Sequence, residues 1–261
     1  MQQYMHTMPT RSKGSKRKKK ARTYMGRIGI IGAMEEEVAL LKEKMDIEVI
    51  VKKASMEFYQ GTLNNHEIVV VRSGIGKVNA GLCAQILIDV FNVSQLINTG
   101  IAGSLKAEIN IGDIVVSSDA LQHDVDARNF GYSRGEIPRM DTISFPADPE
   151  LISISKEACR KVNPDINVFV GRIVTGDQFI AERTVKNEIA SWTEGYCTEM
   201  EGAAIAQAAY LNRVPFVIVR AISDKADDSA AMDYPTFEQQ AIQHSVKLIE
   251  EFVSQIPEDT F

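Results

Sequence analysis

Cysteine is scarce in this 261-residue chain, and its three residues have no spacing that predicts a disulfide framework or a zinc site. Cys83, Cys159 and Cys197 form an odd set without a CxxC pair. This usage is typical of a reducing compartment, so we expect a cytoplasmic protein. The histidines are scattered without an HExxH pattern, and we therefore predict no metal site and no cofactor.

Long apolar runs, a secretion signal and a dinucleotide-binding fingerprint are also missing. No apolar run approaches the ~20 residues that span a bilayer, and the N-terminus lacks the apolar core of a signal peptide. Gly29 and Gly32 do not complete a GxGxxG motif. We therefore expect neither a membrane partner nor a dinucleotide cofactor.

Acidic residues are missing from positions 1–24, which hold eight of the 29 Lys and Arg residues. The whole chain has 35 Asp and Glu residues, so the remainder carries a net charge of about −14. We predict that 1–24 is a basic, disordered extension, with a polyanion-binding tail as the alternative. The acidic body, 25–261, is expected to bind no nucleic acid specifically.

Alternating strand and helix patterns run through this body without a repeat or a linker, which predicts a single α/β domain. Its central sheet is expected to be mixed, mostly parallel and twisted, with helices on its faces. Predicted strands are 27–33, 49–53, 56–63, 67–72, 95–104 (ending in a small-residue loop), 113–120, 167–175 and a buried run at 217–219. Predicted helices are 34–45, 73–92, 151–162, 198–210 and 237–254. The long segment 123–149 is predicted to be a functional loop.

Polar residues follow the apolar run at 217–219, where a strand should end. Arg220, Ser223 and Asp224 are therefore candidates for chemistry, because ligands of α/β sheets bind beyond the carboxyl ends of the strands. Three further carboxylates fall at strand ends or predicted helix starts: Glu37, Glu199 and Glu201. Singly, each Glu fits a helix dipole and Asp224 fits a helix cap. Several of them at one end of one sheet would instead favour an active site.

Six motifs follow one another in order: IGIIGAMEEEV from Ile28, SGIGKV from Ser73, NTGIAG from Asn98, GDIVVS from Gly112, EMEGAAIA from Glu199 and VPFVIVRAISD from Val214. Together they resemble the bacterial 5′-methylthioadenosine/S-adenosylhomocysteine nucleosidases of the nucleoside phosphorylase superfamily. The resemblance spans 26–261. It implies a nucleoside phosphorylase-like fold and hydrolysis of the bond between adenine and a 5′-thio-substituted ribose.

The resemblance also implies catalytic roles. Asp224, oriented by Ser223, would protonate adenine N7, and Glu37 would activate water on the opposite face of the sugar. Asp224 can act as an acid only if its pKa is raised, because an ordinary Asp is ionised at neutral pH. Glu201 would hold the ribose hydroxyls, with the Met200 backbone nearby and Arg220 as a supporting charge.

Other positions would bind the rest of the nucleoside. Phe179 would stack on adenine, the Ile180 backbone would hydrogen-bond its edge, and Met34 and Tyr234 would contact the 5′-thio group. The remaining substrate-binding positions that the resemblance implies are Ala33, Ile75, Ile101, Glu199 and Ala226. Phe130 and Pro138 match positions that reach into a neighbouring subunit's site, which implies a homodimer.

Three residues depart from the family pattern. Ile101 stands where many relatives have Ser, Tyr234 where Phe is common, and Lys225 where an apolar residue is frequent. Ile101 removes a hydroxyl near the water or the ribose, Tyr234 adds one to the 5′ pocket, and Lys225 would affect the pKa of Asp224 if it faced the site.

Two other functions remain as alternatives. A phosphorylase on the same fold would need cations for phosphate, which Arg72 could supply but which Glu35, Glu36 and Glu37 oppose. A non-catalytic nucleoside-binding protein would not need an acid and a base on opposite faces of the sugar. The preferred 5′ substituent stays open among methylthioadenosine, S-adenosylhomocysteine, 5′-deoxyadenosine and aminodeoxyfutalosine.

Overall fold

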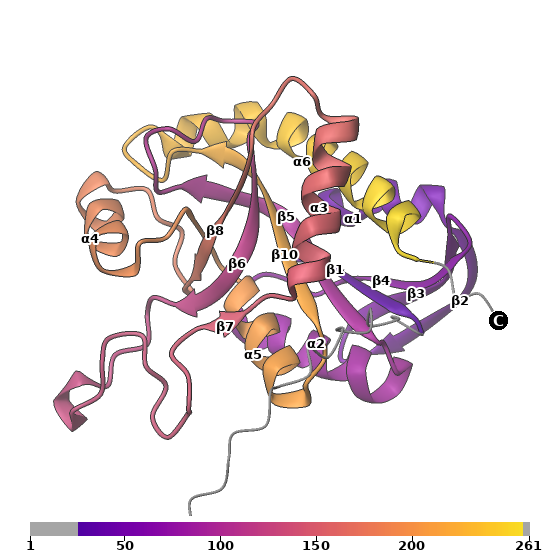
Figure 1. The fold of residues 1–261 in the computed structure, drawn as a ribbon, viewed down its shortest axis with the longest axis horizontal. Coiled ribbons are helices and arrows are strands. Elements are labelled where there is room, and N and C mark those ends of the chain that lie inside the picture. Colours follow the sequence, from indigo (N-terminus) through magenta and orange to yellow (C-terminus); the bar gives the residue numbers. More distant parts are fainter. Residues whose placement is uncertain (1–25, 258–261) are drawn as a thin grey trace, which may run out of the picture.

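The structure, a computed structural model, describes residues 26–257, apart from the side chains at 231 and 232, as one α/β body (Figure 1). Its strands are β1 (Ile28–Gly32), β2 (Asp46–Lys53), β3 (Met56–Leu63), β4 (His66–Arg72), β5 (Gln95–Ser104), β6 (Ile114–Gln122), β7 (Phe145–Pro146), β8 (Val168–Thr175), β9 (Cys197–Glu199) and β10 (Phe216–Asp224). Its helices are α1 (Glu35–Lys44), α2 (Lys77–Phe91), α3 (Pro149–Val162), α4 (Arg183–Thr193), α5 (Gly202–Asn212) and α6 (Ala230–Gln255). The predicted α/β class is confirmed.

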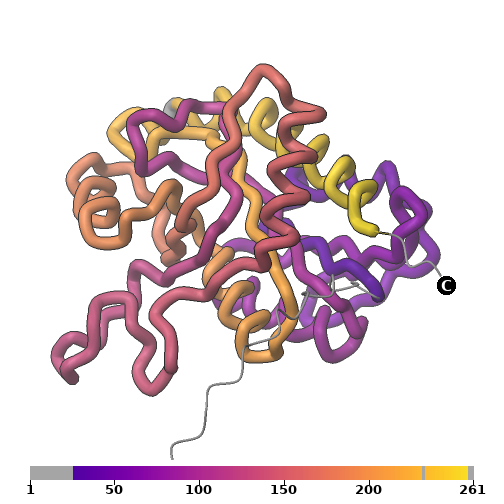
Figure 2. The backbone as a smooth tube through the Cα atoms, viewed as in Figure 1, coloured from indigo at the N-terminus to yellow at the C-terminus, as the bar shows by residue number. Residues whose placement is uncertain are grey.

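Helices cover both faces of the central sheet, as the ribbon and the tube show (Figure 1, Figure 2). α2 and α5 pack together over one face, where Leu87 and Ile205 belong to the same buried core. The Ala-rich sequence of α5 allows this close approach. α1, α3 and α6 cover the other face, and Leu41, Cys159 and Phe252 belong to its core. The central strands are therefore buried between two apolar layers, and ligands can reach them only at their ends, whereas β2 at the edge of the sheet is largely exposed.

The sheet is mixed, with five parallel and five antiparallel pairings. β5 pairs with β10, β10 with β6, β6 with β8, β8 with β9 and β9 with β5, so these five strands close into a ring. β1, β4, β3 and β2 continue from β5 as an open sheet. The antiparallel share is larger than expected. The prediction also had no strand at 197–199, which is the one that closes the ring.

Most predicted elements are present, but several boundaries were wrong. The helix expected from residue 73 begins at Lys77, because Gly74 and Gly76 have φ values of 84° and 96°, outside the helical region. The helix expected from 198 begins at Gly202, α6 already begins at Ala230, and α4 was not predicted. The Asn64-Asn65 hairpin turn is confirmed, since both residues have the positive φ, 50° and 66°, of a type I′ turn.

The predicted long loop projects from the body between β6 and β7 (Figure 1). We call residues 123–144 the arm. It contains one short 3-10 helix, Arg128–Phe130, and β7 follows it. At its root the guanidinium of Arg134 lies 4.7 Å from the ring centre of Trp192 and donates a 2.7 Å hydrogen bond to Glu188. The arm is thus attached to α4 although its tip stands away from the core.

Residues 1–25 and 258–261 lie outside the described part, so the predicted basic extension at 1–24 remains a prediction. Within 26–257, none of the helices combines the length and the apolar character needed to cross a bilayer.

Candidate active site

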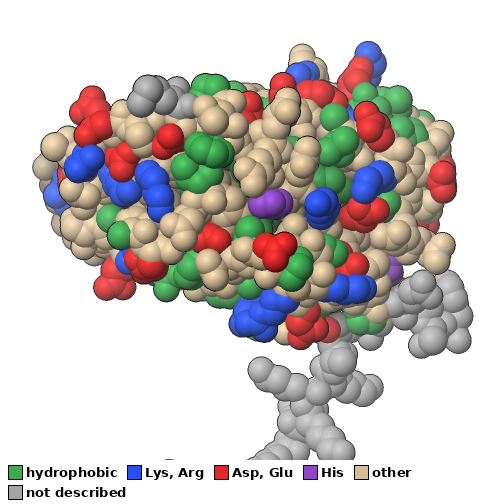
Figure 3. Space-filling view, turned by 90° about the horizontal axis from the view of Figure 1, so that it is seen from above, with side chains coloured by type: hydrophobic (Ala, Val, Ile, Leu, Met, Phe, Trp, Pro, Cys, Tyr) green, Lys and Arg blue, Asp and Glu red, His purple; other side chains and the backbone are tan. Residues whose placement is uncertain are grey.

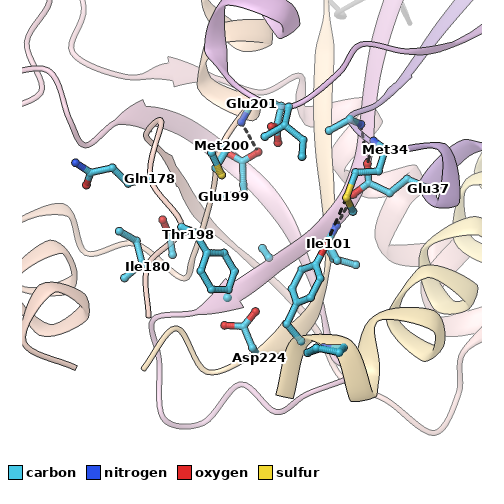
Figure 4. A pocket seen from close by; sticks show the side chains of 17 residues that line it. Met34, Glu37, Ile101, Gln178, Ile180, Thr198, Glu199, Met200, Glu201 and Asp224 are labelled. Atoms are coloured by element: carbon cyan, nitrogen blue, oxygen red, sulfur yellow. Dashed lines mark hydrogen bonds between the residues drawn. The ribbon is translucent and has the colours of Figure 1, made fainter. Parts of the chain in front are cut away.

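A cavity of about 490 Å³ opens at the carboxyl ends of the central strands (Figure 4). This volume is in the ~300–1,000 Å³ range of small-molecule sites. Twelve predicted site residues line it: Ala33, Met34, Glu37, Ile75, Ile101, Phe179, Ile180, Glu199, Met200, Glu201, Asp224 and Tyr234. Within residues 26–257, no group of three or more His, Cys, Asp or Glu side chains is arranged to hold a metal ion.

Five predicted site residues do not line the cavity. Arg220, Ser223 and Ala226 are buried behind its wall. Phe130 and Pro138 lie on the arm, where Phe130 is 84% exposed. Five unpredicted residues complete the lining: Ala102, Gly103, Gln178, Thr198 and Pro235. Each is a chain neighbour of a predicted residue or motif, which is the signal that could have revealed it.

Asp224 ends β10 and turns its carboxyl group into the cavity (Figure 4). Its Oδ2 accepts a 2.9 Å hydrogen bond from the Ser223 hydroxyl, and its Oδ1 accepts a 2.7 Å bond from the Ala226 N–H. Burial raises the pKa of Asp224, and these two bonds oppose the rise. A Cβ on Gly103 would lie 2.7 Å from Oδ1, so this position of β5 must be glycine for the carboxyl group to fit.

Glu37 lies in the first turn of α1, so its side chain reaches back to the start of its own helix. Its Oε2 accepts hydrogen bonds from the N–H groups of Ala33 (2.6 Å) and Met34 (3.0 Å), and its Oε1 accepts one from Ile101 (3.2 Å). Burial raises its pKa, while Arg220 and these N–H groups oppose the rise. The Glu37 carboxylate therefore complements the dipole of α1, as considered from the sequence, and also forms part of the cavity wall.

Arg220 acts at one remove from the cavity. It is 2% exposed and donates hydrogen bonds to the Glu199 carboxylate and, at 2.5 Å, to Asn98 Oδ1. Glu199 in turn accepts a 3.1 Å bond from the Glu201 N–H. Its ion-pair partner is Glu199, and its positive charge also acts on Glu201, whose pKa it lowers against the effect of burial. The role of Arg220 as a supporting charge at the ribose stays a prediction.

Glu201 is a cavity carboxylate whose pKa is raised into the neutral range. Its Oε1 accepts a 2.8 Å hydrogen bond from the Gly76 N–H at the start of α2. Burial and the neighbouring charge of Glu199 raise the pKa of Glu201 from 4.5 to about 8. In the unliganded protein this group therefore holds a proton at neutral pH, whereas a bound partner that donates hydrogen bonds would favour its ionised form.

This shift predicts how stability depends on pH. Because the folded-state pKa of Glu201 lies above its unfolded value, its stabilising effect is complete below pH 4.5 and is lost as pH rises toward 8. We expect the melting temperature of the unliganded protein to fall over this interval and Glu201→Gln to reduce that slope. Glu43→Gln, at an exposed position of α1, is the control. An unchanged slope in the Glu201 variant would contradict the assignment.

Comparison with known proteins places this site in a family. The model of the phosphorylase superfamily matches residues 27–254. A 5′-methylthioadenosine/S-adenosylhomocysteine nucleosidase of an Exiguobacterium species is 43% identical over 224 residues, 85% of this chain and 95% of its own length. The chain belongs to the 5′-methylthioadenosine/S-adenosylhomocysteine nucleosidases.

Solved structures of these nucleosidases share the fold. The Neisseria meningitidis enzyme, in complex with methylthio-immucillin-A, superposes with a TM-score of 0.85 at 37% identity, covering 88% of this chain and 99% of its own. The Colwellia psychrerythraea enzyme, in complex with adenine, gives a TM-score of 0.85 at 38% identity, covering 88% and 96%. The predicted nucleoside phosphorylase-like fold is thereby confirmed.

The three departures from the nucleosidase pattern can now be located. Ile101 lines the cavity and donates its backbone N–H to Glu37, so this position supports the carboxylate without a side-chain hydroxyl. The Tyr234 hydroxyl donates a 2.9 Å bond to Glu238. Lys225 points away from the cavity, with its ammonium group donating to the carbonyl of Ile109. It therefore does not pair with Asp224.

Proposed function

We propose that this chain hydrolyses the N-glycosidic bond of 5′-methylthioadenosine and S-adenosylhomocysteine, and also of 5′-deoxyadenosine, releasing adenine and the 5′-substituted ribose. The observation that carries the proposal is the presence of Asp224 and Glu37 in the wall of one cavity, in a chain of this family. Both carboxyl groups have raised pKa values because they are buried. One can therefore hold a proton for the leaving base while the other receives one from water.

Asp224 is assigned as the acid. As the C1′–N9 bond breaks, its electron pair moves to the purine, and the Asp224 proton passes to N7 so that adenine leaves as a neutral base. Positive charge develops on the sugar, as in other glycoside hydrolyses. Ser223 and the Ala226 N–H hold the carboxyl group in place. Its buried position favours the protonated form that the step requires.

Glu37 is assigned as the base. A carboxylate offers about four acceptor positions, and three are occupied by the N–H groups of Ala33, Met34 and Ile101. The remaining position can take a proton from a water molecule while the oxygen of that water bonds to C1′. Because the three N–H groups fix the carboxylate, the water it binds is held in one direction.

Glu201 is proposed to accept hydrogen bonds from the ribose hydroxyls and to stabilise the cationic sugar once it is ionised. The base would stack on Phe179 and bond to the Ile180 backbone. The 5′-thio group would contact Met34 and the Tyr234 ring, whose hydroxyl lies 3.5 Å from the Met34 sulfur.

A homodimer is proposed from the exposed apolar surface beside the cavity. Val78 and Leu82, one turn apart on α2, are 81% and 46% exposed, and Ile75 at the cavity wall is 54% exposed. Phe130 and Pro138 on the arm would enter the neighbouring subunit's site. Grouped apolar side chains of this kind favour association. Sedimentation equilibrium of the purified protein tests this, and a monomer at micromolar concentration would rule it out.

Phosphate is disfavoured as the nucleophile by the charge of the cavity. Among the described residues that line it, every acidic or basic side chain is a carboxylic acid (Glu37, Glu199, Glu201 and Asp224) and none is a Lys or Arg that could bind phosphate. Arg72, the cation considered for phosphate, lies 3.9 Å from Glu35 and is 55% exposed. A phosphate dianion would be repelled where water can bind.

Adenine release from methylthioadenosine should therefore proceed at the same rate with and without phosphate. The sugar product should be free 5-methylthioribose, identified by mass spectrometry. A rate that vanished in phosphate-free buffer, with formation of a ribose 1-phosphate, would favour the phosphorylase. Measuring adenine release from S-adenosylhomocysteine, 5′-deoxyadenosine and aminodeoxyfutalosine in the same assay would define the 5′ preference.

A further inference from the structure

Helix α2 begins at the cavity without an N-terminal cap of its own. Its N-cap position is Gly76, no side chain there caps the helix, and its first turn has no acidic residue. Two carboxylates from distant parts of the chain replace the cap. The Gly76 N–H donates to Glu201, and the next N–H, of Lys77, donates to Asp177 Oδ1 at 2.8 Å. Adjacent amides thus connect α2 both to the proposed ribose carboxylate and to the loop that carries Phe179.

The Lys77 side chain adds a third loop to this junction. Its ammonium group donates to Asp124 Oδ1 at 2.6 Å and to Gln122 Oε1 at 3.0 Å. The other oxygen of Asp124, Oδ2, accepts a 3.0 Å bond from the Asp177 N–H, which closes the circuit. We call Lys77, Gln122, Asp124 and Asp177 the Lys77 cluster.

The Lys77 cluster differs from an ordinary surface ion pair. The Lys77 and Asp124 side chains are only 18% and 19% exposed, and each also bonds to a further group of the cluster. An isolated exposed pair contributes ~0–1 kcal/mol, whereas linked bonds of this kind depend on one another. The pKa of Asp124 is lowered by Lys77 and by the Asp177 N–H, against the opposing effect of burial.

We propose that Lys77 is a positioning residue for substrate binding. Through Asp124 and Asp177 it holds together the loop that carries Ile75 and Gly76, the root of the arm and the loop that carries Phe179. It thereby sets the Gly76 N–H against Glu201 at the same time as it places the proposed adenine-stacking ring. None of the cluster lines the cavity, so its effect on the nucleoside is indirect. The inference rests on the proposed function only in naming which part of the nucleoside each loop holds.

Loosening the Lys77 cluster should weaken contacts that exist in the bound substrate as well as in the transition state. Loss of such uniform binding raises KM and leaves kcat nearly unchanged. We expect Lys77→Met and Asp124→Asn each to raise KM for methylthioadenosine by about ten-fold, with kcat within about three-fold of the wild type. Lys77→Arg, which can still pair with Asp124, should restore most of the affinity.

The double variant Lys77→Met/Asp124→Asn measures how strongly the effects of the two substitutions on KM depend on each other. If the two residues act as one unit, it should be no worse than either single variant, whereas independent effects would multiply to about a hundred-fold. Lys161→Met is the matched control, because Lys161 forms an ion pair of the same length, 2.6 Å, with Glu251 between α3 and α6. It should leave both KM and kcat unchanged.

The affinity for adenine, measured by calorimetry on the same variants, reads binding without turnover. This measurement therefore tests the role of the Lys77 cluster even if the wild type hydrolyses no nucleoside. An inactive wild type would overturn the proposed function but not the role of the cluster. Adenine should bind about ten-fold more weakly to Lys77→Met and normally to Lys161→Met. Unchanged adenine affinity in Lys77→Met, a fall in kcat without a rise in KM, or multiplicative effects in the double variant would each overturn the proposal. Asp124→Asn preserves the shape of the side chain and serves if Lys77→Met does not fold.

Discussion

Asp224→Asn should release adenine from methylthioadenosine about 10²–10⁴-fold more slowly than the wild type, because that is the usual contribution of positioned proton transfer. The substitution preserves the local structure. The amide oxygen can accept the Ala226 N–H in place of Oδ1, and the Ser223 hydroxyl can rotate to accept from the new NH₂ group. Only the transferable proton is lost.

The affinity for adenine separates this effect from misfolding. The Kd of the Asp224→Asn variant should stay within about ten-fold of the wild type, since the stacking and the other polar contacts remain. The wild-type rate should also fall as pH rises through the raised pKa of Asp224, and the variant should lack this limb. Turnover close to the wild type would remove Asp224 from the role of acid.

Glu37→Gln should lower kcat by about 10²–10⁴-fold for the complementary reason, since water then has no base. It also disturbs the site. The Gln oxygen can take over the bonds from Ala33 and Met34, but its NH₂ group then faces the Ile101 N–H, so two donors meet. A lower melting temperature is therefore expected together with the slower turnover, whereas Asp224→Asn should leave the melting temperature nearly unchanged.

The pH profile identifies the loss as that of a base. Glu37 must be ionised to accept a proton, so wild-type activity should fall as pH drops through its raised pKa. The Glu37→Gln variant should retain no such acidic limb in its residual activity. A variant with the wild-type rate, or one whose acidic limb persists unchanged, would contradict the assignment.

How far the sequence could predict the site depends on the kind of contact. The apolar run before Arg220 located a buried strand, and the family resemblance located twelve cavity residues, nine of them within the six motifs. The motif glycines were harder to interpret. A Cβ on Gly100 would lie 2.5 Å from Glu37 Oε1, and Gly103 has the same relation to Asp224. The stretch expected to be a small-residue loop is a continuous strand, whose glycines admit both carboxyl groups.

Contacts between distant loops could not be predicted. The partners of Arg220 and the bond from Gly76 to Glu201 join residues from separate motifs, and no local pattern records such pairs. Short secondary-structure elements could not be predicted for a related reason. β9 has three residues, too few to show periodicity, and it exists because β5 and β8 pair with it on either side. Tertiary contacts decided these features and local propensity did not.

The central claim is that Asp224 and Glu37 divide the proton transfers between the leaving base and the water. The most direct test replaces adenine by 4-nitrophenolate, a leaving group that departs without protonation, on the same 5-methylthioribose. On this substrate Asp224→Asn should recover turnover close to the wild type, while Glu37→Gln should remain slow. Equal impairment of Asp224→Asn on the nitrophenyl and adenine substrates would contradict the account.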